Sequence, residues 1–456
     1  MRDIEQYIAG VWTPGAGTDR FTVLGPADGM QVSRAPQATP GDVDAAVKAA
    51  HAAQPGWART APAGRSGAIR RAAVAVDAAA DRLAAVMHAE TGQPVGVARD
   101  LVAGGAGALR QYAELGRLHG GRALAGDPGA IDLMVPAPRG VVAVITPWSD
   151  PIVVSCGLLG AALVTGNTVV YKPSERAPAT GWELTRILAA ELPDAVLSLV
   201  TGDGRAGAAL AAADVDVIAH VGSIAAGRSI AAAAAATGAK VLLHNGGSDA
   251  LIVDADVDPV WAAQQAALGA FADSGQASAA VERIYVVRAV AERFLDALLE
   301  AAGAWAERLG PLVDVRHRAQ VHARVTAAVE AGATLLCGGR IPAGAGAHYP
   351  PTVLTGCADE MAVVAEGTVG PVAAVVVVGG FDEALERASC SMYGLTATVL
   401  TGSMSRAQAA WQGLSAGTIN INAVFGGAPD PRRGPDLLDE FTVTKVVHLE
   451  APPGGW

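Results

Sequence analysis

Hydrophobic positions in the first quarter of the chain recur mainly at helical spacing, which predicts a helical N-terminal region. The predicted helices cover residues 45–57, 61–92 and 99–118. A start signal stands before the first of them. Thr39 can cap a helix, Pro40 suits its first turn and Asp42 favours the positive end of its dipole. Residues 4–36 are broken by Gly, Pro and Asp, which indicates short strands and loops.

From residue 140 onward, short apolar runs rich in Val and Ile alternate with helical segments. The predicted strands are residues 140–146, 168–172, 197–201, 217–221 and 240–243. The predicted helices between them are residues 155–164, 180–192, 206–213 and 226–237. Strands joined by helices of this length form right-handed βαβ units, so the pattern predicts a parallel sheet. The segment 141–145 is apolar throughout and is expected to be buried on both faces.

A second α/β block follows. Its predicted helices are residues 262–271, 289–309, 318–331 and 404–414, and its predicted strands are residues 284–287, 373–378, 396–401 and 418–421. The last segment, residues 441–449, alternates apolar and polar residues beyond a loop rich in Pro, Arg and Asp at residues 429–439. A strand so far along the chain is expected at a sheet edge or in exchange with another chain.

Length and composition narrow the class of protein. A chain of 456 residues is too long for one hydrophobic core, so two or more domains are expected. The hydrophobic fraction of 51%, with a mean hydropathy of +0.32, supplies ample apolar surface to bury. Because aromatic residues make up only 4%, Ala, Val and Leu must fill the cores.

Charge and cysteine content argue against several functions. A net charge of −11 and a pI near 5.3 argue against nucleic acid and against anionic membranes. The first ten residues lack the apolar core of a signal peptide, and no apolar run approaches the ~20 residues of a membrane span. The spacing of the cysteines is not that of a zinc site, so we expect reduced thiols, no bound metal and a cytoplasmic location. The four cysteines are Cys156, Cys337, Cys357 and Cys390.

Three polar segments follow predicted strands, at the sheet edge where open α/β folds bind ligands. The first is Thr146, Pro147, Trp148, Ser149 and Asp150. Taken alone, this segment is equally well explained as a turn flanked by prolines.

The second segment ends a strand with a cation and a carboxylate three residues apart. Lys172 can donate to ribose hydroxyls or a phosphate, and Glu175 can accept from an adenosine 2′-hydroxyl. Because a carboxylate repels a 2′-phosphate, this pair mildly favours NAD over NADP. An ordinary surface ion pair is the alternative interpretation.

The third segment runs from a strand into the start of a helix, at Gly222, Ser223 and Gly227. Free N–H groups and the helix dipole make such a start suitable for a pyrophosphate. The spacing is not G-x-G-x-x-G, so the signal is weak by itself.

Together with further motifs, the chain resembles the aldehyde dehydrogenase superfamily from about Tyr7 to Leu449. The motifs that carry the resemblance are Pro147–Trp148, Gly166–Asn167–Thr168, Lys172–Pro173–Ser174–Glu175, Gly202–Asp203–Gly204, Gly222–Ser223, Gly246–Gly247, Gly275–Gln276, Gly370–Pro371, Tyr393–Gly394–Leu395, Asn422 and Phe425–Gly426–Gly427. The resemblance implies a Rossmann-like, parallel-sheet NAD(P) domain, an α/β catalytic domain and a small β element for oligomerisation. It also implies a homodimer or homotetramer and a small-molecule substrate.

The resemblance also sets expected domain boundaries and cofactor contacts. The NAD(P)-binding domain is expected over residues 1–128 and 146–246, the catalytic domain over 247–428, and the oligomerisation strands over 129–145 and 429–456. The expected cofactor-binding residues are Thr146, Pro147, Trp148, Lys172, Ser174, Glu175, Gly204, Gly222, Ser223 and Gly227.

The catalytic positions depart from the family pattern. Ser278 stands at the nucleophilic Cys, His244 at the general-base Glu and Ser149 at the oxyanion Asn. The separation of 278 − 244 = 34 residues resembles the family's own spacing, which supports the alignment. Elsewhere, Leu158 replaces a Lys, and Gly367 and Val369 replace a Glu and a Phe of a motif near the nicotinamide ribose.

These departures change the expected chemistry, because a serine hydroxyl has almost no ionised form near neutrality and needs an adjacent base. The leading interpretation is an NAD(P)-dependent oxidoreductase in a specialised biosynthetic or metabolic step, with Ser278, His244 and Ser149 as candidate catalytic residues. Asp249 and Asp150 are candidates to orient the imidazole of His244. A non-catalytic binding or scaffold subunit and a Ser–His hydrolase or acyl transferase stay open.

Overall fold

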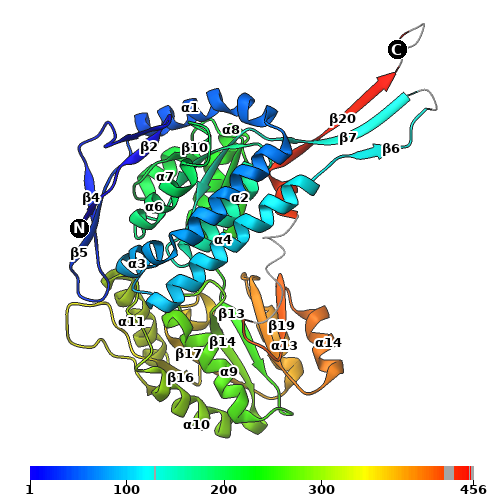
Figure 1. Cartoon of the computed structure of the whole chain (residues 1–456). Helices are drawn as coiled ribbons and strands as arrows, with labels where there is room; N and C mark the ends of the chain where they lie inside the picture. The colour runs from blue at the N-terminus through cyan, green and yellow to red at the C-terminus, as the bar shows by residue number, and fades with distance from the viewer. Residues whose placement is uncertain (128–129, 426–435, 451, 453–456) are drawn as a thin grey trace.

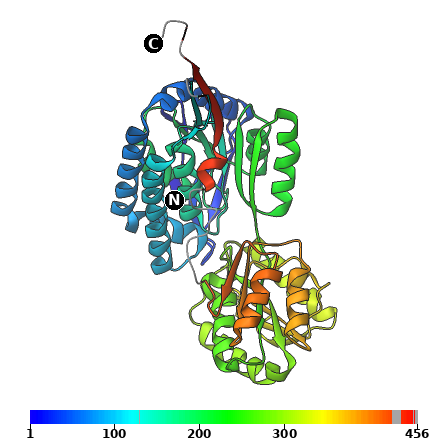
Figure 2. The same cartoon turned by 90° about the vertical axis from the view of Figure 1, so that its right-hand side faces the viewer.

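The computed structural model describes residues 1–127, 130–425, 436–450 and 452. The chain forms two lobes, one above the other, and a long β arm projects from the upper lobe (Figures 1 and 2). The N-terminal half builds the upper lobe and residues after about 246 build most of the lower one. The family-like motif at Gly426–Gly427 and most of the loop at residues 429–439 lie outside the described residues.

The first lobe is built on a seven-stranded sheet with the order β12-β11-β8-β9-β10-β2-β3. The strands are β2 (Gln6–Ile8), β3 (Val11–Thr13), β8 (Val141–Ile145), β9 (Thr168–Lys172), β10 (Leu197–Leu199), β11 (Val217–Gly222) and β12 (Lys240–Asn245). The five strands from β12 to β10 are parallel, and β2 pairs antiparallel with β10. This confirms the predicted parallel sheet.

Helices cover both faces of this sheet. They are α1 (Pro40–Arg59), α2 (Pro62–Ala78), α3 (Ala80–Thr91), α4 (Val95–Leu118), α5 (Pro151–Val164), α6 (Pro178–Ala189), α7 (Gly204–Ala211) and α8 (Ile224–Thr237). One buried cluster joins α2 to α6 with the sheet, and another joins α1, α7 and α8 with its other face. The predicted helix start is confirmed, because Thr39 accepts from the N–H of Asp42 and the Asp42 carboxylate accepts from the N–H of Thr39. The predicted helix over residues 61–92 is two helices, which meet at Ala79.

The order of the strands creates a switch point between β8 and β11. From β8 the chain moves outward to β9 and β10, and it then returns to the other side of β8 for β11 and β12. The chain connections that follow β8 and β11 therefore run toward opposite edges of the sheet. As a result, the loop after β8 and the loop after β11 diverge from each other. In open α/β sheets a crevice for a ligand forms at this place.

The second lobe has its own seven-stranded sheet, with the order β15-β16-β17-β14-β13-β18-β19. The strands are β13 (Asp249–Val253), β14 (Val281–Val287), β15 (Thr334–Cys337), β16 (Thr352–Thr355), β17 (Val372–Val378), β18 (Thr396–Leu400) and β19 (Thr418–Ile421). One face packs on α9 (Pro259–Phe271) and α10 (Arg288–Trp305). The other packs on α11 (Val315–Glu330), α12 (Ala362–Ala365), α13 (Phe381–Ser389) and α14 (Met404–Gly413).

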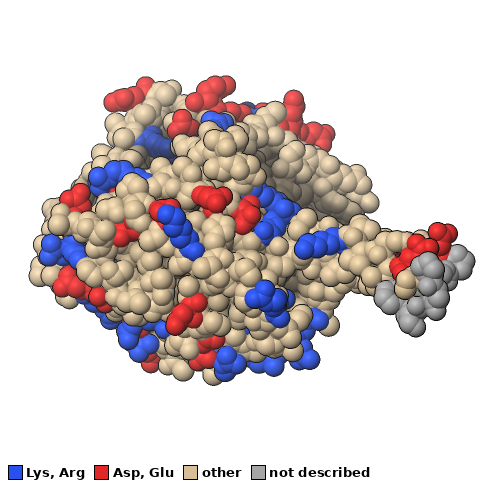
Figure 3. All heavy atoms as spheres, turned by 90° about the horizontal axis from the view of Figure 1, so that it is seen from above, with Lys and Arg blue, Asp and Glu red and all other residues tan. Residues whose placement is uncertain are grey.

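The arm is a three-stranded sheet of β6 (Arg122–Leu124), β7 (Ala130–Pro138) and β20 (Thr442–Glu450), with α15 (Asp436–Glu440) at its base. The pairing of β20 with β7 is antiparallel and runs over the full length of both strands. In the view of Figure 3 the arm extends well beyond the body, whose acidic and basic side chains are interspersed on that face.

The expected arm segment 129–145 is wrong at its C-terminal end. Residue 129 lies outside the described residues, and β7 belongs to the arm, but β8 lies at the centre of the first sheet. The physical reason is visible in the sequence, since all five residues of β8 are apolar and all five are buried. The chain turns at residues 139–140, and the boundary falls there.

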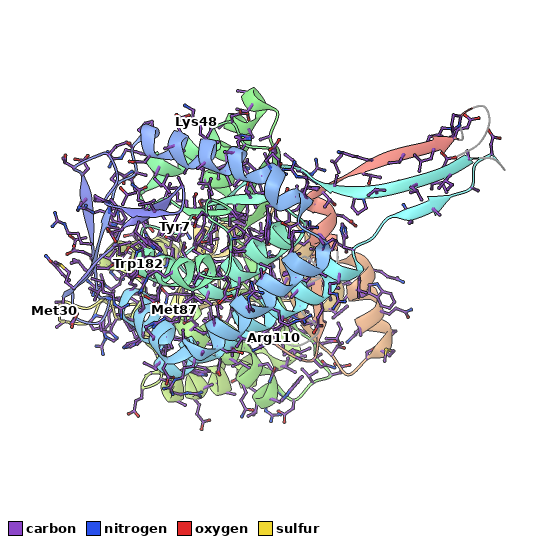
Figure 4. The ribbon with its side chains drawn as sticks, turned by 45° about the horizontal axis from the view of Figure 1, so that its top comes forward. Tyr7, Met30, Lys48, Met87, Arg110 and Trp182 are labelled. Atoms are coloured by element: carbon purple, nitrogen blue, oxygen red, sulfur yellow. The ribbon has the colours of Figure 1, made fainter. Side chains whose placement is uncertain are left out.

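A fourth, small sheet holds the N-terminus against the first lobe, with the order β1-β5-β4 from β1 (Arg2–Asp3), β4 (Arg20–Leu24) and β5 (Gln31–Pro36). Aromatic rings reinforce this side. Tyr7, Trp12 and Trp182 contact one another in series, the first pair tilted and the second edge-on, with 4.7 and 5.9 Å between successive ring centroids, and Figure 4 labels the first and the last. No helix in the described part of the chain has both the length and the hydropathy needed to span a membrane.

Candidate active site

A cavity of about 310 Å³ lies between the two lobes, and strand ends of the first sheet form one side of it. The strands β8, β11 and β12 are parallel, so their carboxyl ends meet at one sheet edge although they are far apart in sequence. The lining residues from this side are Pro147, Trp148, Ser149, Val221, Gly222, Ser223, His244 and Asn245.

The second lobe contributes the opposite edge of its sheet. Residues 246–247 lead into β13, residues 276–280 lead into β14, Val369 precedes β17 and Leu395 precedes β18. All of these segments lie at amino ends of parallel strands. The cavity is therefore enclosed where the carboxyl edge of one sheet faces the amino edge of the other.

The three candidate catalytic residues line this one cavity. His244 is the penultimate residue of β12, Ser149 follows β8, and Ser278 lies on the exposed part of the loop before β14. The hydroxyl of Ser278 donates a hydrogen bond of 3.2 Å to Oδ2 of Asp150. Asp249, the other candidate to orient the imidazole, accepts from the N–H and the hydroxyl of Thr396.

The loop that carries Ser278 begins with a left-handed turn. Asp273, Ser274 and Gly275 have φ values of 51°, 56° and 69°, and left-handed backbone costs roughly 1–2 kcal/mol for each residue other than glycine. The Gln93 amide holds this turn in place, since Nε2 donates to Asp273 Oδ2 and to the carbonyl of Ser149, both at 2.8 Å. One side chain of the first lobe thus fixes the distance between the Ser149 and Ser278 loops.

Burial raises the pKa of Asp273 to about 8, and the neighbouring charge of Asp150 adds to the rise, while the hydrogen bond from Gln93 opposes it. Asp273 is therefore largely neutral at pH 7, beside the carboxylate that accepts from Ser278.

Trp148 forms a fixed wall of the cavity. The Arg176 guanidinium lies 5.4 Å from its ring centroid, and the His317 ring meets it edge-on with 5.4 Å between centroids. Arg176 also pairs with Asp314 across the lobes at 3.0 Å. Because the indole of Trp148 contacts residues of both lobes, a change in the geometry of the cavity should change the environment of this indole.

Lys172 is 4% exposed, so the alternative of an ordinary surface ion pair is wrong for this residue. Its Nζ donates to the carbonyl of Pro173 at 3.0 Å. Burial lowers the pKa of Lys172, and the charges of Glu175 and Asp203 oppose that shift. A buried ammonium at a strand end is poised to meet an anionic or hydroxyl-rich ligand.

Pro147, Trp148, Gly222 and Ser223 line the cavity, whereas the other expected cofactor residues lie elsewhere along the carboxyl edge of the sheet. These others are Thr146, Lys172, Ser174, Glu175, Gly204 and Gly227.

Two of these other residues have local structural roles. The buried Thr146 hydroxyl accepts from Ser155 at 3.2 Å, and the hydroxyl of Ser174 accepts from the N–H of Arg176.

The two glycines stand at helix starts. Gly204 opens α7, and Gly227 lies in the first turn of α8 against the side chain of Asn245.

Sequence reasoning missed several residues of the site, namely Gln93, Asp273, Arg176, Glu282 and His317. The sequence pattern around His317 predicts only a helix, and that around Arg176 predicts only a turn. Neither pattern indicates a contact with the site. Glu282 stands four residues after Ser278, at the start of β14, and this closeness in sequence was the one available signal.

The sequence profile of the aldehyde dehydrogenase family matches residues 12–434. The chain belongs to this family. A 2-hydroxymuconic semialdehyde dehydrogenase from Pseudomonas sp. strain CF600 is 34% identical, over 93% of this chain and 92% of the relative. The crystal structure of lactaldehyde dehydrogenase from Escherichia coli superposes with a TM-score of 0.94 at 32% identity and covers 98% of this chain and 99% of that one. The structure of PnpE in complex with nicotinamide adenine dinucleotide gives 0.94 at 29% identity, with 98% and 97% covered.

Membership of the aldehyde dehydrogenase family confirms the expected fold class and places the chain among NAD(P)-dependent oxidoreductases. The roles of individual residues and the domain functions stay predictions. Within the described ranges, no three His, Cys, Asp or Glu side chains are grouped so as to hold a metal ion.

We expect Asp273→Asn to make the protein less sensitive to alkali. The raised pKa means that the unfolded chain loses this proton at lower pH than the folded chain, so wild-type stability falls as pH rises toward about 8. The variant lacks this loss. Its advantage in unfolding free energy should grow by about 4 kcal/mol between pH 5 and pH 9, since about three pKa units are spanned and each corresponds to about 1.4 kcal/mol.

Urea denaturation at both pH values measures this difference, with the exposed Asp296→Asn as the matched control. Equal pH dependence in Asp273→Asn and wild type would contradict the neutral state of Asp273.

Proposed function

We propose that this protein is an NAD(P)-dependent oxidoreductase that acts on a small molecule through an altered Ser278/His244 site. One observation carries the proposal. The loops that flank the switch point of the first sheet and the loop of Ser278 line the same cavity. A dinucleotide bound at that switch point would therefore have its reactive end within the reach of these two side chains.

The residues present fit such a cofactor. Ser223 caps α8, so free backbone N–H groups at this helix start can meet a pyrophosphate. Lys172 and Glu175 at the end of β9 are placed to meet the ribose of the adenosine half. When bound, the oxidised cofactor supplies a hydride acceptor, and the protein supplies orientation and proton transfer.

NAD is the favoured form of the cofactor. Glu175 is only partly buried, its charge acts on the neighbouring Lys172, and its carboxylate would repel a 2′-phosphate bound near the end of β9. The structurally similar PnpE was solved with nicotinamide adenine dinucleotide.

The chemistry we propose requires no thiolate. Ser278 offers a hydroxyl that is already hydrogen-bonded to a carboxylate, and His244 offers an imidazole for general acid–base catalysis. The thiols of Cys156 and Cys357 are buried, which raises their pKa values to about 12 and about 11, so neither is a substitute nucleophile. Hydride exchange would then take place with a substrate that is not covalently attached.

We further propose that the arm joins copies of this chain into a dimer or tetramer. Its outward apolar side chains are exposed, with Val446 at 69% and Ile131 at 57%. A projecting ribbon with such side chains gains free energy when a second copy covers it.

Titration with NAD is expected to quench the tryptophan fluorescence of the wild type, because Trp148 lines the cavity. Trp148→Phe should lose most of that quenching. Trp411→Phe is the matched control, since Trp411 is 65% exposed on α14. A wild type that binds neither NAD nor NADP by calorimetry would refute the oxidoreductase proposal. Equal quenching in both variants would instead place the cofactor elsewhere.

Ser278→Ala is expected to keep NAD affinity and to lose about 10- to 100-fold in kcat, because one hydrogen bond to the substrate oxygen is worth about 1–3 kcal/mol. Ser405→Ala on α14 serves as the control. Intact-mass spectra during turnover of an aldehyde and alcohol panel should show no adduct. A fluorophosphonate label on Ser278 would favour the hydrolase, and unchanged turnover in Ser278→Ala would exclude a role for its hydroxyl.

Val446→Asp is expected to reduce the molar mass measured by light scattering toward the 45.7 kDa of one chain, because it places a charge on the outer face of the arm. Val329→Asp, an exposed position on α11, is the control and should leave the mass unchanged. A wild type that is already monomeric would refute the role of the arm.

A further inference from the structure

Glu282 places a buried carboxyl in the wall of the cavity. The residue is 5% exposed and lines the cavity together with Ser278 and His244. Its Oε1 accepts two backbone hydrogen bonds, from the N–H of Thr368 at 2.8 Å and of Val369 at 2.5 Å. Its Oε2 is shielded from solvent and has no hydrogen-bond partner within the described residues. A buried carboxylate oxygen without a partner costs free energy, so this oxygen is suited to carry or to receive a proton.

The loop held by Oε1 does not depend on Oε2. Arg324 donates to the carbonyl of Gly367, Tyr393 donates to that of Glu366 at 3.2 Å, and the His317 ring donates to that of Val369 at 2.6 Å. These contacts hold Val369 at a φ of +53°, which is unusual for a β-branched residue. Since Oε1 and these three side chains anchor the loop, Glu282 Oε2 has no part in holding the loop.

Gly367 makes room for that second oxygen. Its φ is +71°, and a Cβ built at this position would lie 1.9 Å from Glu282 Oε2. Gly367 is one of the departures from the family pattern, and it has a physical consequence in the structure. The Glu282 carboxyl occupies the space that a side chain at 367 would need.

Charged and titratable groups surround this carboxyl on several elements. Burial raises the pKa of Glu282 to about 7, and the charge of Asp249 on β13 adds to the rise. The two N–H groups of the loop and the charge of Arg324 on α11 oppose it. Glu282 in turn helps to raise the pKa of Tyr393. The carboxyl therefore changes protonation near pH 7.

We propose that Glu282 is a further catalytic residue, which exchanges a proton with the hydroxyl group of the bound substrate. This rests on the oxidoreductase function proposed above and assigns its proton acceptor. In the oxidative direction, the O–H bond of an alcohol or hydrated aldehyde breaks and its proton goes to Oε2. NAD(P)⁺, when bound, would supply the acceptor for the hydride from the same carbon, as the C=O bond forms. A hydrated aldehyde, RCH(OH)₂, would thus give RCOOH and NAD(P)H, and Glu282 would release its proton after the product leaves.

The rest of the cavity indicates the substrate class. The wall formed by α5 is apolar, with Val153, Val154 and Leu158, and Leu437 adds to it. The polar groups on the opposite side are Gln276 and Ser278 in the loop before β14 and Glu282 at the start of β14. We infer a small alcohol or aldehyde hydrate with an apolar substituent.

Glu282→Gln separates this role from loop anchoring, because the amide keeps an acceptor oxygen for Thr368 and Val369 and cannot take a proton. We expect wild-type kcat/KM to rise with pH through about 7, as the carboxylate forms. Glu282→Gln should lose this rise and about 10²-fold or more of the activity at high pH. Glu282→Ala removes both roles and serves as the comparison.

A second readout does not depend on turnover. NAD⁺ brings a positively charged ring toward the cavity and favours the carboxylate, so its binding near pH 7 should release more protons from wild type than from Glu282→Gln. A pH indicator in weakly buffered solution measures the difference.

Equal proton release and parallel pH profiles in the two proteins would overturn the proposal, as would loss of activity in Glu282→Ala alone. A wild-type profile that is flat between about pH 6 and pH 8 would overturn it without any variant. Failure of the wild type to bind a dinucleotide would instead refute the proposed function itself.

Discussion

The site exists because two parallel sheets meet edge to edge. A parallel sheet has one edge of carboxyl ends and one of amino ends, and here the carboxyl edge of the first sheet faces the amino edge of the second. Each lining segment is short, since it is only the connection between a strand and its neighbouring helix. The two cores can therefore be built from Ala, Val and Leu without regard to chemistry. The polar groups of the site lie in the narrow gap between them, where side chains of Gln93, Arg176 and His317 contact the other lobe.

Burial has the same effect on three titratable groups at this gap. The pKa values of Asp273 and Glu282 rise, and that of His317 falls, in each case mainly because water is excluded. All three shifts favour the neutral form. The cavity is thus less charged near neutrality than its composition suggests. Such an environment favours an uncharged substrate and lets a single proton move without large reorganisation.

The sequence was sufficient for most of the architecture. The all-apolar strand β8, the capping box of Thr39 and Asp42, and the regular alternation after residue 140 are local signals, and the structure follows them. The predicted boundary at residue 145 is wrong because β7 of the arm and β8 of the first sheet are separated by a turn of only two residues. The family motifs brought Ser149, His244 and Ser278 to one cavity. Contacts across the lobes, such as Trp148 with His317, have no signature in spacing, since neither partner's periodicity depends on the other. The second oxygen of Glu282 is also invisible in the sequence, because its isolation depends on the backbone at Gly367.

The placement of reactive side chains at strand ends also bears on how such a protein evolves. Ser278 is exposed and His244 is only half-buried, so neither contributes to the five buried apolar clusters. Replacing them alters reactivity at little cost in folding free energy. A chain of this architecture can therefore exchange its reactive groups one at a time and remain folded at each step. Folded intermediate proteins that catalyse no reaction efficiently would still be present, and selection could then favour a different reaction.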